Sequence, residues 1–328
     1  MNILVTGGTG FTGAALVLKL LEKGHSVRSI DYQKGIIYEK LKKAGVDLLI
    51  GSITDAELVQ KSMKGIDFVF HIAAAFRELD VPDKHYYDVN VNGTRNVMEA
   101  AAKNDVIKVV YCSTQGVHGH IFNPPGDENS PISPEDYYQQ TKYEGELVTH
   151  EFIKSGMNAT IIRPTAIYGP GDPARFLMIF KRAQKGYFPM FGSGATFYHP
   201  LYIDNLVDAF LLVMDPEKGK GETYIIGDEE YLSIKNLAIK TGNAMGMNIK
   251  VWHFPLLPLR IAGHACEKIC KPFGIAPPIF PRRVDWFRQV RAFSIDKAKQ
   301  ELGYVPMIGI DEGLKRTAAW YMQEGYLN

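Results

Sequence analysis

The sequence predicts an α/β fold: a doubly wound parallel sheet with helices on both faces, followed by a smaller C-terminal lobe. Three observations support this fold class. Short apolar runs alternate with helical stretches through the first half, a glycine-rich turn separates the first run from the first helix, and Pro and Gly become frequent after Arg163. Strands that alternate with helices form βαβ units and a parallel sheet. Because such crossovers are right-handed, helices cover both faces.

The elements follow in a regular order along the first half. Apolar, β-rich runs predict strands at residues 2–5, 26–30, 47–50, 67–72, 107–112 and 159–162. Apolar residues at helical spacing predict helices at 11–23, 55–63, 83–103 and 138–154, with Asp55 near the start of its helix. We therefore assign residues 1–165 to the first domain, with a later return segment near 200–226. Residues 166–328 belong mainly to a second lobe of irregular elements.

Composition and charge narrow the class of protein. The 328 residues are 46% apolar and 22% charged, which excludes a mainly disordered chain. The net charge is +1, so no basic excess points to nucleic acid. Three cysteines cannot form a disulfide framework, and Cys266, Cys270 and His264 lack the usual zinc spacing, so they are interpreted as helix packing residues and no metal is expected. We expect a reduced, cytoplasmic enzyme without a secretory signal or a membrane span.

The turn at residues 6–13 reads TGGTGFTG and lies between the first strand and the first helix. In such a turn, the first glycines allow a tight bend close to a pyrophosphate, and the last lets the helix pack against the strand. The free N–H groups of the helix N-terminus also attract phosphate. The turn therefore predicts a dinucleotide site, with a purely structural glycine turn as the alternative. The residues expected to line it are Gly7, Gly8, Gly10, Phe11, Thr12 and Gly13.

Asp31 closes the second strand, about 20 residues beyond the glycine turn. An acid at this place accepts hydrogen bonds from the adenosine ribose hydroxyls and repels a 2′-phosphate. The sequence therefore favours NAD over NADP as the cofactor. A surface acid at a strand end, without a role in binding, is the alternative.

A series of motifs in chain order resembles the extended short-chain dehydrogenase/reductase superfamily, which includes nucleotide-sugar epimerases, dehydratases and 3β-hydroxysteroid dehydrogenases. The similar segments are TGGTGFTG at 6–13, GSITD at 51–55, HIAA at 71–74, NVNGT at 90–94, STQGVHG at 113–119, YQQTK at 138–142, RPTAIYGPG at 163–171 and LGYVP at 302–306. The chain departs from the pattern at Ser52, where the family usually has Asp.

This resemblance implies a Rossmann-like fold, an NAD cofactor and a small-molecule substrate. It also implies a homodimer formed through the predicted helices at 83–103 and 138–154. By the same resemblance, the cofactor contacts include Ser52, Ile53, Ala73, Ala74, Asn90, Tyr138, Lys142 and Pro164.

Tyr138 and Lys142 stand four residues apart, on one face of a predicted helix. A tyrosine with a pKa of about 10 is a poor base at neutral pH, but a nearby ammonium favours the phenolate. Tyr138 is therefore the candidate for proton exchange with a substrate hydroxyl, and the resemblance implies that Lys142 also holds the nicotinamide ribose. Thr114 takes the place of the family's catalytic Ser or Thr, with Ser113 as the alternative. An exposed Tyr–Lys pair without a catalytic role is the other interpretation.

The substrate class depends on positions after the sixth strand. Sugar-nucleotide epimerases commonly carry an Asn and an Arg that bind the diphosphate, and this chain has Ala166 and Tyr198 near those places. Neither side chain supplies a charged donor. Together with the apolar segment 251–281, this favours an NAD-dependent oxidoreductase acting on a secondary alcohol or ketone of a fairly apolar molecule. The candidate substrate contacts are Thr165, Ala166, Tyr198, His199, Arg282 and Arg283.

Two other functions stay open at this point. In an NAD-dependent UDP-sugar 4-epimerase that retains its cofactor, the missing diphosphate contacts would be replaced by Arg282, Arg283, Arg175 or Lys181. A non-catalytic dinucleotide-binding module is the second alternative, which the presence of the Tyr–Lys pair disfavours. Gln115 and Gly116 stand where a dehydratase usually has acids, which argues against dehydration.

Three histidines and one apolar segment are less specific indicators of function. His118, His120 and His199 are expected in loops that approach the pocket; a histidine can carry protons, but a role outside catalysis is the favoured interpretation for each of the three. The segment 251–281 is proline-rich and is expected to cover the mouth of the sheet as core packing between the lobes. A lid over an apolar substrate and a peripheral membrane contact are its alternatives.

Overall fold

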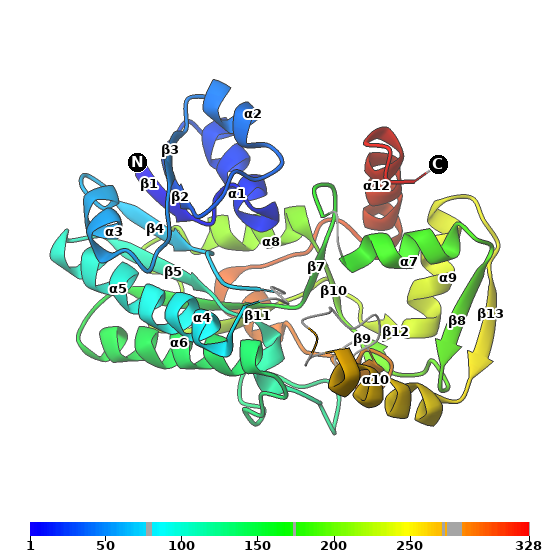
Figure 1. Cartoon of the computed structure of the whole chain (residues 1–328). Helices are drawn as coiled ribbons and strands as arrows, with labels where there is room; N and C mark the ends of the chain where they lie inside the picture. Colours follow the sequence, from blue (N-terminus) through cyan, green and yellow to red (C-terminus); the bar gives the residue numbers. More distant parts are fainter. Residues whose placement is uncertain (77–80, 173–174, 271–272, 274–283, 328) are drawn as a thin grey trace.

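A seven-stranded sheet runs through the first domain of the computed structural model (Figure 1). The structure describes residues 1–76, 81–172, 175–270, 273 and 284–327. The strand order is β11-β6-β5-β4-β1-β2-β3, and every neighbouring pair is parallel. The strands are β1 (Asn2–Thr6), β2 (Ser26–Asp31), β3 (Asp47–Ile50), β4 (Phe68–His71), β5 (Lys108–Cys112), β6 (Ala159–Pro164) and β11 (Thr223–Ile226). The predicted Rossmann-like α/β fold is confirmed.

Helices cover both faces of the sheet because successive strand residues point to opposite sides. In β1, Ile3 and Val5 pack in one core cluster, whereas Leu4 belongs to another. The first face carries α1 (Phe11–Glu22) and α8 (Ile203–Leu212). The second face carries α3 (Ala56–Ser62), α5 (Gly93–Lys103) and α6 (Tyr137–Lys154). Since both faces are closed, a ligand reaches the sheet at the carboxyl ends of its strands.

The stretch predicted as one helix at 83–103 has three parts. α4 (Asp83–Tyr87) leads into a π-helical turn, η1 (Asp88–Asn92), and α5 follows. Gly93 lies at the second junction, where an added Cβ would lie 2.7 Å from Ile53 Cδ1. Such π-turns are frequent at functional sites. A short helix that the pattern did not predict, α2 (Tyr38–Lys43), precedes β3.

The second lobe is built from regular elements, which corrects the expectation of irregular ones. Three two-stranded sheets pair β7 (Ala166–Tyr168) with β10 (Pro200–Tyr202), β8 (Tyr187–Phe191) with β13 (Lys250–Phe254), and β9 (Phe197–Tyr198) with β12 (Leu232–Ser233). The helices include α7 (Arg175–Ala183), α9 (Ile234–Ala244), α10 (Leu256–Cys270) and α12 (Ile310–Gln323). The glycines separate these elements: Gly186 and Gly192 flank β8 with φ of +78° and +85°.

The chain returns to the sheet after the second lobe has begun. β11 pairs with β6, and α8 packs with α1 on the first face. A second π-helical turn, η4 (Ala298–Leu302), joins the same core cluster. The two domains therefore interleave along the sequence, and the division at residue 165 stays a prediction.

Candidate active site

The glycine turn is packed too tightly for side chains at several of its positions. Gly7 has φ of +72°, and an added Cβ would lie 2.9 Å from Ala73 N, at the end of β4. An added Cβ at Gly13 would lie 2.1 Å from Gly7 O. The turn is followed at once by α1, for which Gly10 is the N-cap and Phe11 and Thr12 are the first residues. The first N–H groups of α1 lack intrahelical partners and can bind phosphate.

Asp31 is held by the glycine turn. The N–H and the hydroxyl of Thr9 donate to Asp31 Oδ2 at 3.0 and 2.8 Å. The Asp31 side chain lies at the carboxyl end of β2 and is 7% exposed. Its orientation is therefore fixed beside the turn, as a ribose-binding acid requires. The sequence pattern did not predict the Thr9 contacts.

A buried histidine ties β1 to α5 beneath the turn. Thr94 donates to Asn90 O at 2.7 Å, so its oxygen accepts from His71 Nε2 at 2.9 Å. His71 Nδ1 must then accept from the hydroxyl of Thr6, at 2.8 Å. Burial lowers the pKa of His71 to about 3, so the ring is neutral. Ala73 N donates to the same Thr6 hydroxyl at 3.1 Å, which fixes the backbone predicted to line the cofactor.

Asn90 links the segment after β4 to the helix that carries the Tyr–Lys pair. Its Oδ1 accepts from Ala75 N at 2.8 Å, and its Nδ2 donates to the hydroxyl of Thr141 at 2.9 Å. Thr141 immediately precedes Lys142 in α6. Asn90 therefore joins the segment after β4, which includes Ala74, to helix α6. Both lie where the cofactor is predicted to bind.

Two residues predicted to contact the cofactor, Ser52 and Ile53, lie between β3 and α3. Ser52 Oγ accepts from the N–H and the hydroxyl of Thr54, at 3.2 and 2.9 Å. Ile53 is buried, and its carbonyl accepts from Asn96 at 3.0 Å. A surface hollow of about 300 Å³ is lined by Ser52, Thr54, His85, Asp88, Val89 and Asn92. Ser52, which replaces the Asp usual in the family, thus borders this surface hollow.

Lys142 lies deep in the site and faces an aromatic ring. It is 1% exposed, and its Nζ lies 4.2 Å from the centroid of the Tyr111 ring. Burial lowers the pKa of Lys142 to about 8, while Cys112 and Glu146 oppose this change. The amine is therefore mainly protonated at pH 7. Gly145 allows α6 to approach Tyr111 closely, since an added Cβ would lie 2.3 Å from the hydroxyl of Tyr111.

Tyr138 lies in the first turn of α6, one turn before Lys142. Asp136 caps this helix by accepting from Gln139 N at 2.9 Å. The Tyr138 ring is half-buried and lies 4.9 Å from the Phe76 ring, centroid to centroid. Phe76 lies in the segment that follows β4, five residues beyond its end at His71, so the predicted acid–base residue lies where α6 approaches the carboxyl edge of the sheet.

Thr114 and Ser113 follow β5 at the same edge. Thr114 is half-buried, and its Oγ1 accepts from Gly116 N at 3.0 Å at the start of the 3-10 helix η2 (Gln115–His118). This contact leaves the Thr114 hydroxyl hydrogen available to a substrate oxygen. Ser113 Oγ is buried without a hydrogen-bond partner among the described residues. An added Cβ at Gly116 would lie 3.1 Å from Gln139 Cγ, so this segment lies against the first turn of α6.

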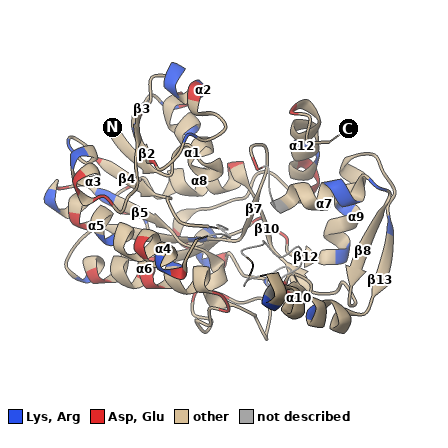
Figure 2. Ribbon diagram, in the orientation of Figure 1, with Lys and Arg blue, Asp and Glu red and all other residues tan. Residues whose placement is uncertain are grey.

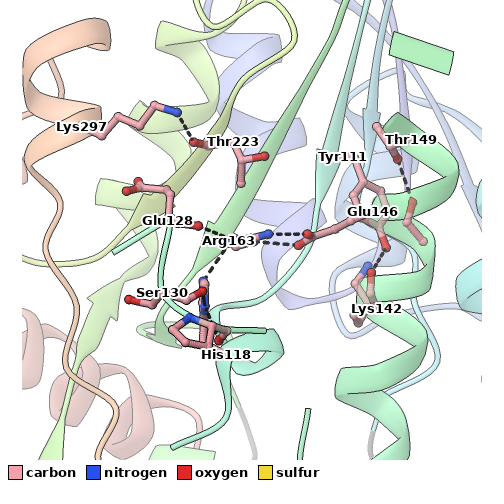
Figure 3. A network of polar contacts seen from close by, with 12 residues as sticks. Tyr111, His118, Glu128, Ser130, Lys142, Glu146, Thr149, Arg163, Thr223 and Lys297 are labelled. Atoms are coloured by element: carbon pink, nitrogen blue, oxygen red, sulfur yellow. Dashed lines mark hydrogen bonds and ion pairs between the residues drawn. The ribbon is translucent and has the colours of Figure 1, made fainter. Parts of the chain in front are cut away.

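A buried ion pair connects α6 to β6 behind Lys142 (Figure 3). Arg163 Nε and Nη2 donate to the two carboxylate oxygens of Glu146, at 2.9 and 2.6 Å. Arg163 Nη1 also donates to His118 Nε2 at 3.0 Å, so His118 Nδ1 carries the hydrogen that is donated to Ser130 O at 3.0 Å. Burial and Arg163 lower the pKa of His118. This network, which the sequence analysis missed, fixes η2 and α6 relative to the sheet.

The three histidines have different environments, and the loop prediction is wrong for His118 only. His118 ends the η2 helix rather than lying in a loop, and its ring is held in the ion-pair network. His199 is 2% exposed, and its Nε2 donates to Asp228 O at 2.8 Å. Burial lowers the pKa of His199 to about 4, so this ring is neutral at pH 7. His120 accepts from Val290 N at 3.1 Å.

The candidate substrate residues after β6 have different environments. Pro164 ends β6, and the hydroxyl of Thr165 donates to Pro200 O at 3.3 Å. Ala166 N donates to His199 O at 2.9 Å. Tyr198 is 2% exposed and contacts the rings of Phe176 and Trp286. Arg282 and Arg283 lie outside the described residues.

A buried carboxyl group lies where the return strand meets the second lobe. Asp228 Oδ1 accepts from Tyr202 N at 2.9 Å and from Asn205 Nδ2 at 2.7 Å. Asp228 Oδ2 has no hydrogen-bond partner among the described residues. Burial raises the pKa of Asp228 to about 7, although Tyr202 N, Asn205 and Tyr168 act in the opposite direction. The described residues hold no group of three or more potential metal ligands, and the Sγ atoms of Cys266 and Cys270 are 3.9 Å apart.

The fold and the site define an oxidoreductase-type enzyme with a dinucleotide cofactor and a Tyr–Lys pair. The family model described as "NAD dependent epimerase/dehydratase family" matches residues 3–227. The chain therefore belongs to this family, and it is an NAD-dependent enzyme of the extended short-chain dehydrogenase/reductase type. The resemblance found in the motifs is confirmed.

Similar proteins include both epimerases and a hydroxysteroid dehydrogenase of this superfamily. An N-acetyl-alpha-D-glucosaminyl-diphospho-ditrans,octacis-undecaprenol 4-epimerase of Escherichia coli is 28% identical, covering 96% of this chain and 94% of the relative. A 3 beta-hydroxysteroid dehydrogenase/isomerase of Mycobacterium tuberculosis is 31% identical, covering 98% and 90%. The solved UDP-glucose 4-epimerase of Thermotoga maritima has a TM-score of 0.80 and 26% identity, covering 99% of each chain.

The residues of the first domain fit NAD. Glycine is required at the turn, Asp31 is oriented beside it, and Lys142 makes no hydrogen bond through Nζ to another described residue. When bound, NAD supplies hydride transfer at a carbon that carries an alcohol or a ketone. The chain is accordingly an NAD-dependent oxidoreductase that works at a secondary alcohol or ketone carbon.

Proposed function

We propose that the substrate is a fairly apolar small molecule and that the reaction is a net oxidation or reduction with release of the cofactor product. The observation that carries this proposal is the environment of Ala166 and Tyr198. Both are about 2% exposed, and Tyr198 packs among aromatic rings, so neither position offers a charged donor to a diphosphate. The name of the Mycobacterium relative, a hydroxysteroid dehydrogenase, supports an apolar alcohol as substrate.

Three side chains would carry the proton chemistry. The Tyr138 hydroxyl exchanges a proton with the substrate oxygen, because the buried ammonium of Lys142 favours the phenolate. The Thr114 hydroxyl donates to the same substrate oxygen and orients it, since its own oxygen is already used by Gly116 N. Ser113 stays the alternative, because its buried hydroxyl has no partner among the described residues.

The proposal is tested by NADH formation, followed by absorbance, on a panel of apolar secondary alcohols. We expect turnover on at least one of them, and Tyr138→Phe should lower kcat by about 10²–10⁴-fold with NAD affinity nearly unchanged. Tyr137→Phe is the matched control, since Tyr137 is the preceding residue of the same helix turn and should keep full activity. Retained turnover in Tyr138→Phe would remove this residue as the acid–base group.

A UDP-sugar 4-epimerase with retained NAD is the second candidate, because relatives with epimerase names match nearly the whole chain. Thermal stability of the NAD complex with and without excess UDP separates the two. A ligand at 100 times its Kd adds about 2.7 kcal/mol, which gives a clear shift. A specific UDP shift would make the epimerase the leading function. Full NAD binding without turnover on any substrate would instead favour a non-catalytic binding module.

We also propose a cytoplasmic homodimer. The helices α4, α5 and α6 lie together on one side of the sheet (Figure 1), and Tyr87 and Leu147 are exposed there at 40% and 44%. Apolar side chains of this size on neighbouring helices suit a helix-to-helix contact between two copies. Sedimentation equilibrium would give the mass of the assembly, and a monomer at all concentrations would contradict the proposal.

A further inference from the structure

The segment from β13 through α10 exposes an unusual number of large apolar side chains. Twenty such side chains are exposed in the described part of the chain, and six of them fall between residues 252 and 273: Trp252, Phe254, Leu257, Ile261, Ile269 and Phe273. Their exposed fractions run from 42% for Phe254 to 74% for Phe273. A helix at the surface of a globular protein normally turns polar residues to water. These exposed side chains therefore favour contact with an apolar environment outside the protein.

The apolar residues of α10 form an outward face. Gly263 is buried, which marks the side of α10 that packs on the protein. Leu257, Ile261 and Ala265 recur every four residues on the other side, and all three are exposed. Leu257 and Ile261 are each 63% exposed. β13 leads into this helix (Figure 1). It adds Trp252, which stacks on the Tyr187 ring at a centroid distance of 4.9 Å.

Positive charge accompanies this apolar face. Residues 250–270 contain Lys250, Arg260 and Lys268 against the single acid Glu267, a net charge of +2. The whole chain has a net charge of +1, so the remaining residues sum to −1. Arg260 and Lys268 are both exposed, and α10 carries blue positions in Figure 2. Exposed apolar residues with flanking cations match the surface of an anionic bilayer.

We propose that the surface formed by β13 and α10 docks on an anionic lipid bilayer, with α10 lying in the plane of the interface. The apolar side chains would enter the acyl boundary, and Arg260 and Lys268 would pair with lipid phosphates. No described helix is long and apolar enough to cross a membrane, which agrees with an interfacial position. The proposal goes beyond the catalytic function, because docking needs neither the Tyr–Lys pair nor a substrate.

The test is co-sedimentation of the full chain, loaded with NAD, with vesicles of two compositions. We expect at least tenfold more bound protein on phosphatidylglycerol/phosphatidylcholine vesicles than on phosphatidylcholine alone. Binding should fall when NaCl is raised from 0.1 M to 1 M, because the screening length drops from about 10 Å to about 3 Å. Equal, salt-independent binding to both vesicles, or no binding, would overturn the proposal.

Variants locate the contact. Ile261→Asp should lower vesicle binding at least tenfold, whereas Val305→Asp should not, although the two side chains are 63% and 61% exposed. Arg260→Ala with Lys268→Ala should remove the preference for phosphatidylglycerol. Unchanged melting temperature and NAD affinity show that each variant is folded. If Ile261→Asp instead splits a dimer in ultracentrifugation and leaves vesicle binding intact, the face is a contact between copies and the proposal is wrong.

Discussion

Asp31 owes its orientation to a residue in the glycine turn. Thr9 binds one carboxylate oxygen through both its N–H and its hydroxyl, which fixes the acid at the place predicted for the cofactor's ribose. The sequence predicted the acid because its distance from the turn is a local property. It did not predict Thr9 as the partner, because the contact joins residues on two different strand ends and depends on how β1 and β2 pair.

Asp31→Ala should weaken NAD and relax the preference against NADP. Losing hydrogen bonds to a charged group costs about 1.5–3 kcal/mol, or roughly ten- to a hundredfold in Kd. Calorimetry with each cofactor measures both effects. Thr9→Val is the comparison variant. It removes the hydroxyl contacts with Asp31, Gln33 and Gly35 but keeps the Asp31 charge and the contact from Thr9 N, so its effect on the cofactor ratio should be smaller than that of Asp31→Ala. An unchanged NAD to NADP ratio in Asp31→Ala would mean that the acid has no role in selection.

The pair formed by Arg163 and Glu146 joins the central helix α6 to strand β6. Both side chains are buried, with exposed fractions of 6% and 0%. A buried ion pair adds little over apolar packing of the same shape, but breaking it leaves one charge without compensation. The packing of α6, and with it the position of Lys142, should therefore tolerate the complete ion pair or the loss of both charges. It should not tolerate the loss of only one charge.

Arg163→Met should destabilise the fold by about 3–5 kcal/mol, because Glu146 is left charged and buried. The double variant Arg163→Met with Glu146→Leu should recover most of that loss. Urea denaturation followed by circular dichroism measures both values. A double variant as unstable as the single one would show that the bond from Arg163 to His118, rather than the ion pair, stabilises this region.

Elements of the first domain could be predicted because each rests on a local pattern. The run at 2–5 and the spacing of Tyr138 and Lys142 both correspond to elements in the structure, β1 and α6. The burial of Lys142 against Tyr111 could not be predicted, because it depends on how α6 packs across β5. In the second lobe, glycine and proline also lie inside helices, as Gly242 does in α9 and Pro258 in α10, and they interrupt the apolar periodicity, so α9 and the full length of α10 were not predicted.

The whole molecule should respond to pH through the buried carboxyl of Asp228. Its pKa is raised from 3.8 to about 7 in the folded chain, so the folded state binds a proton that the unfolded state has lost. This contribution to stability is complete below pH 3.8 and is lost as the pH rises through about 7. The buried rings of His71 and His199 act in the opposite direction, because their lowered pKa values of about 3 and 4 favour folding as the pH rises toward 6.5.

Asp228→Asn isolates the carboxyl contribution. Asn keeps an oxygen for Tyr202 N and Asn205 Nδ2 and cannot ionise. The stability of the variant relative to the native chain should increase between pH 4 and 7 by up to about 1.4 kcal/mol per pH unit. Urea unfolding at several pH values gives this difference. A difference that is constant with pH would show that Asp228 does not change its protonation on unfolding.

The return of β11 to the sheet has a consequence for synthesis. The edge of β6 is completed by residues 223–226, and 62 residues separate Pro164 from Ile226. At about 5–20 residues per second, the ribosome needs roughly 3–12 s to make that stretch. During this interval the nascent sheet presents an unpaired strand edge, the kind of surface that pairs with other chains. The late arrival of one strand thus lengthens the time during synthesis in which incorrect strand pairing can occur.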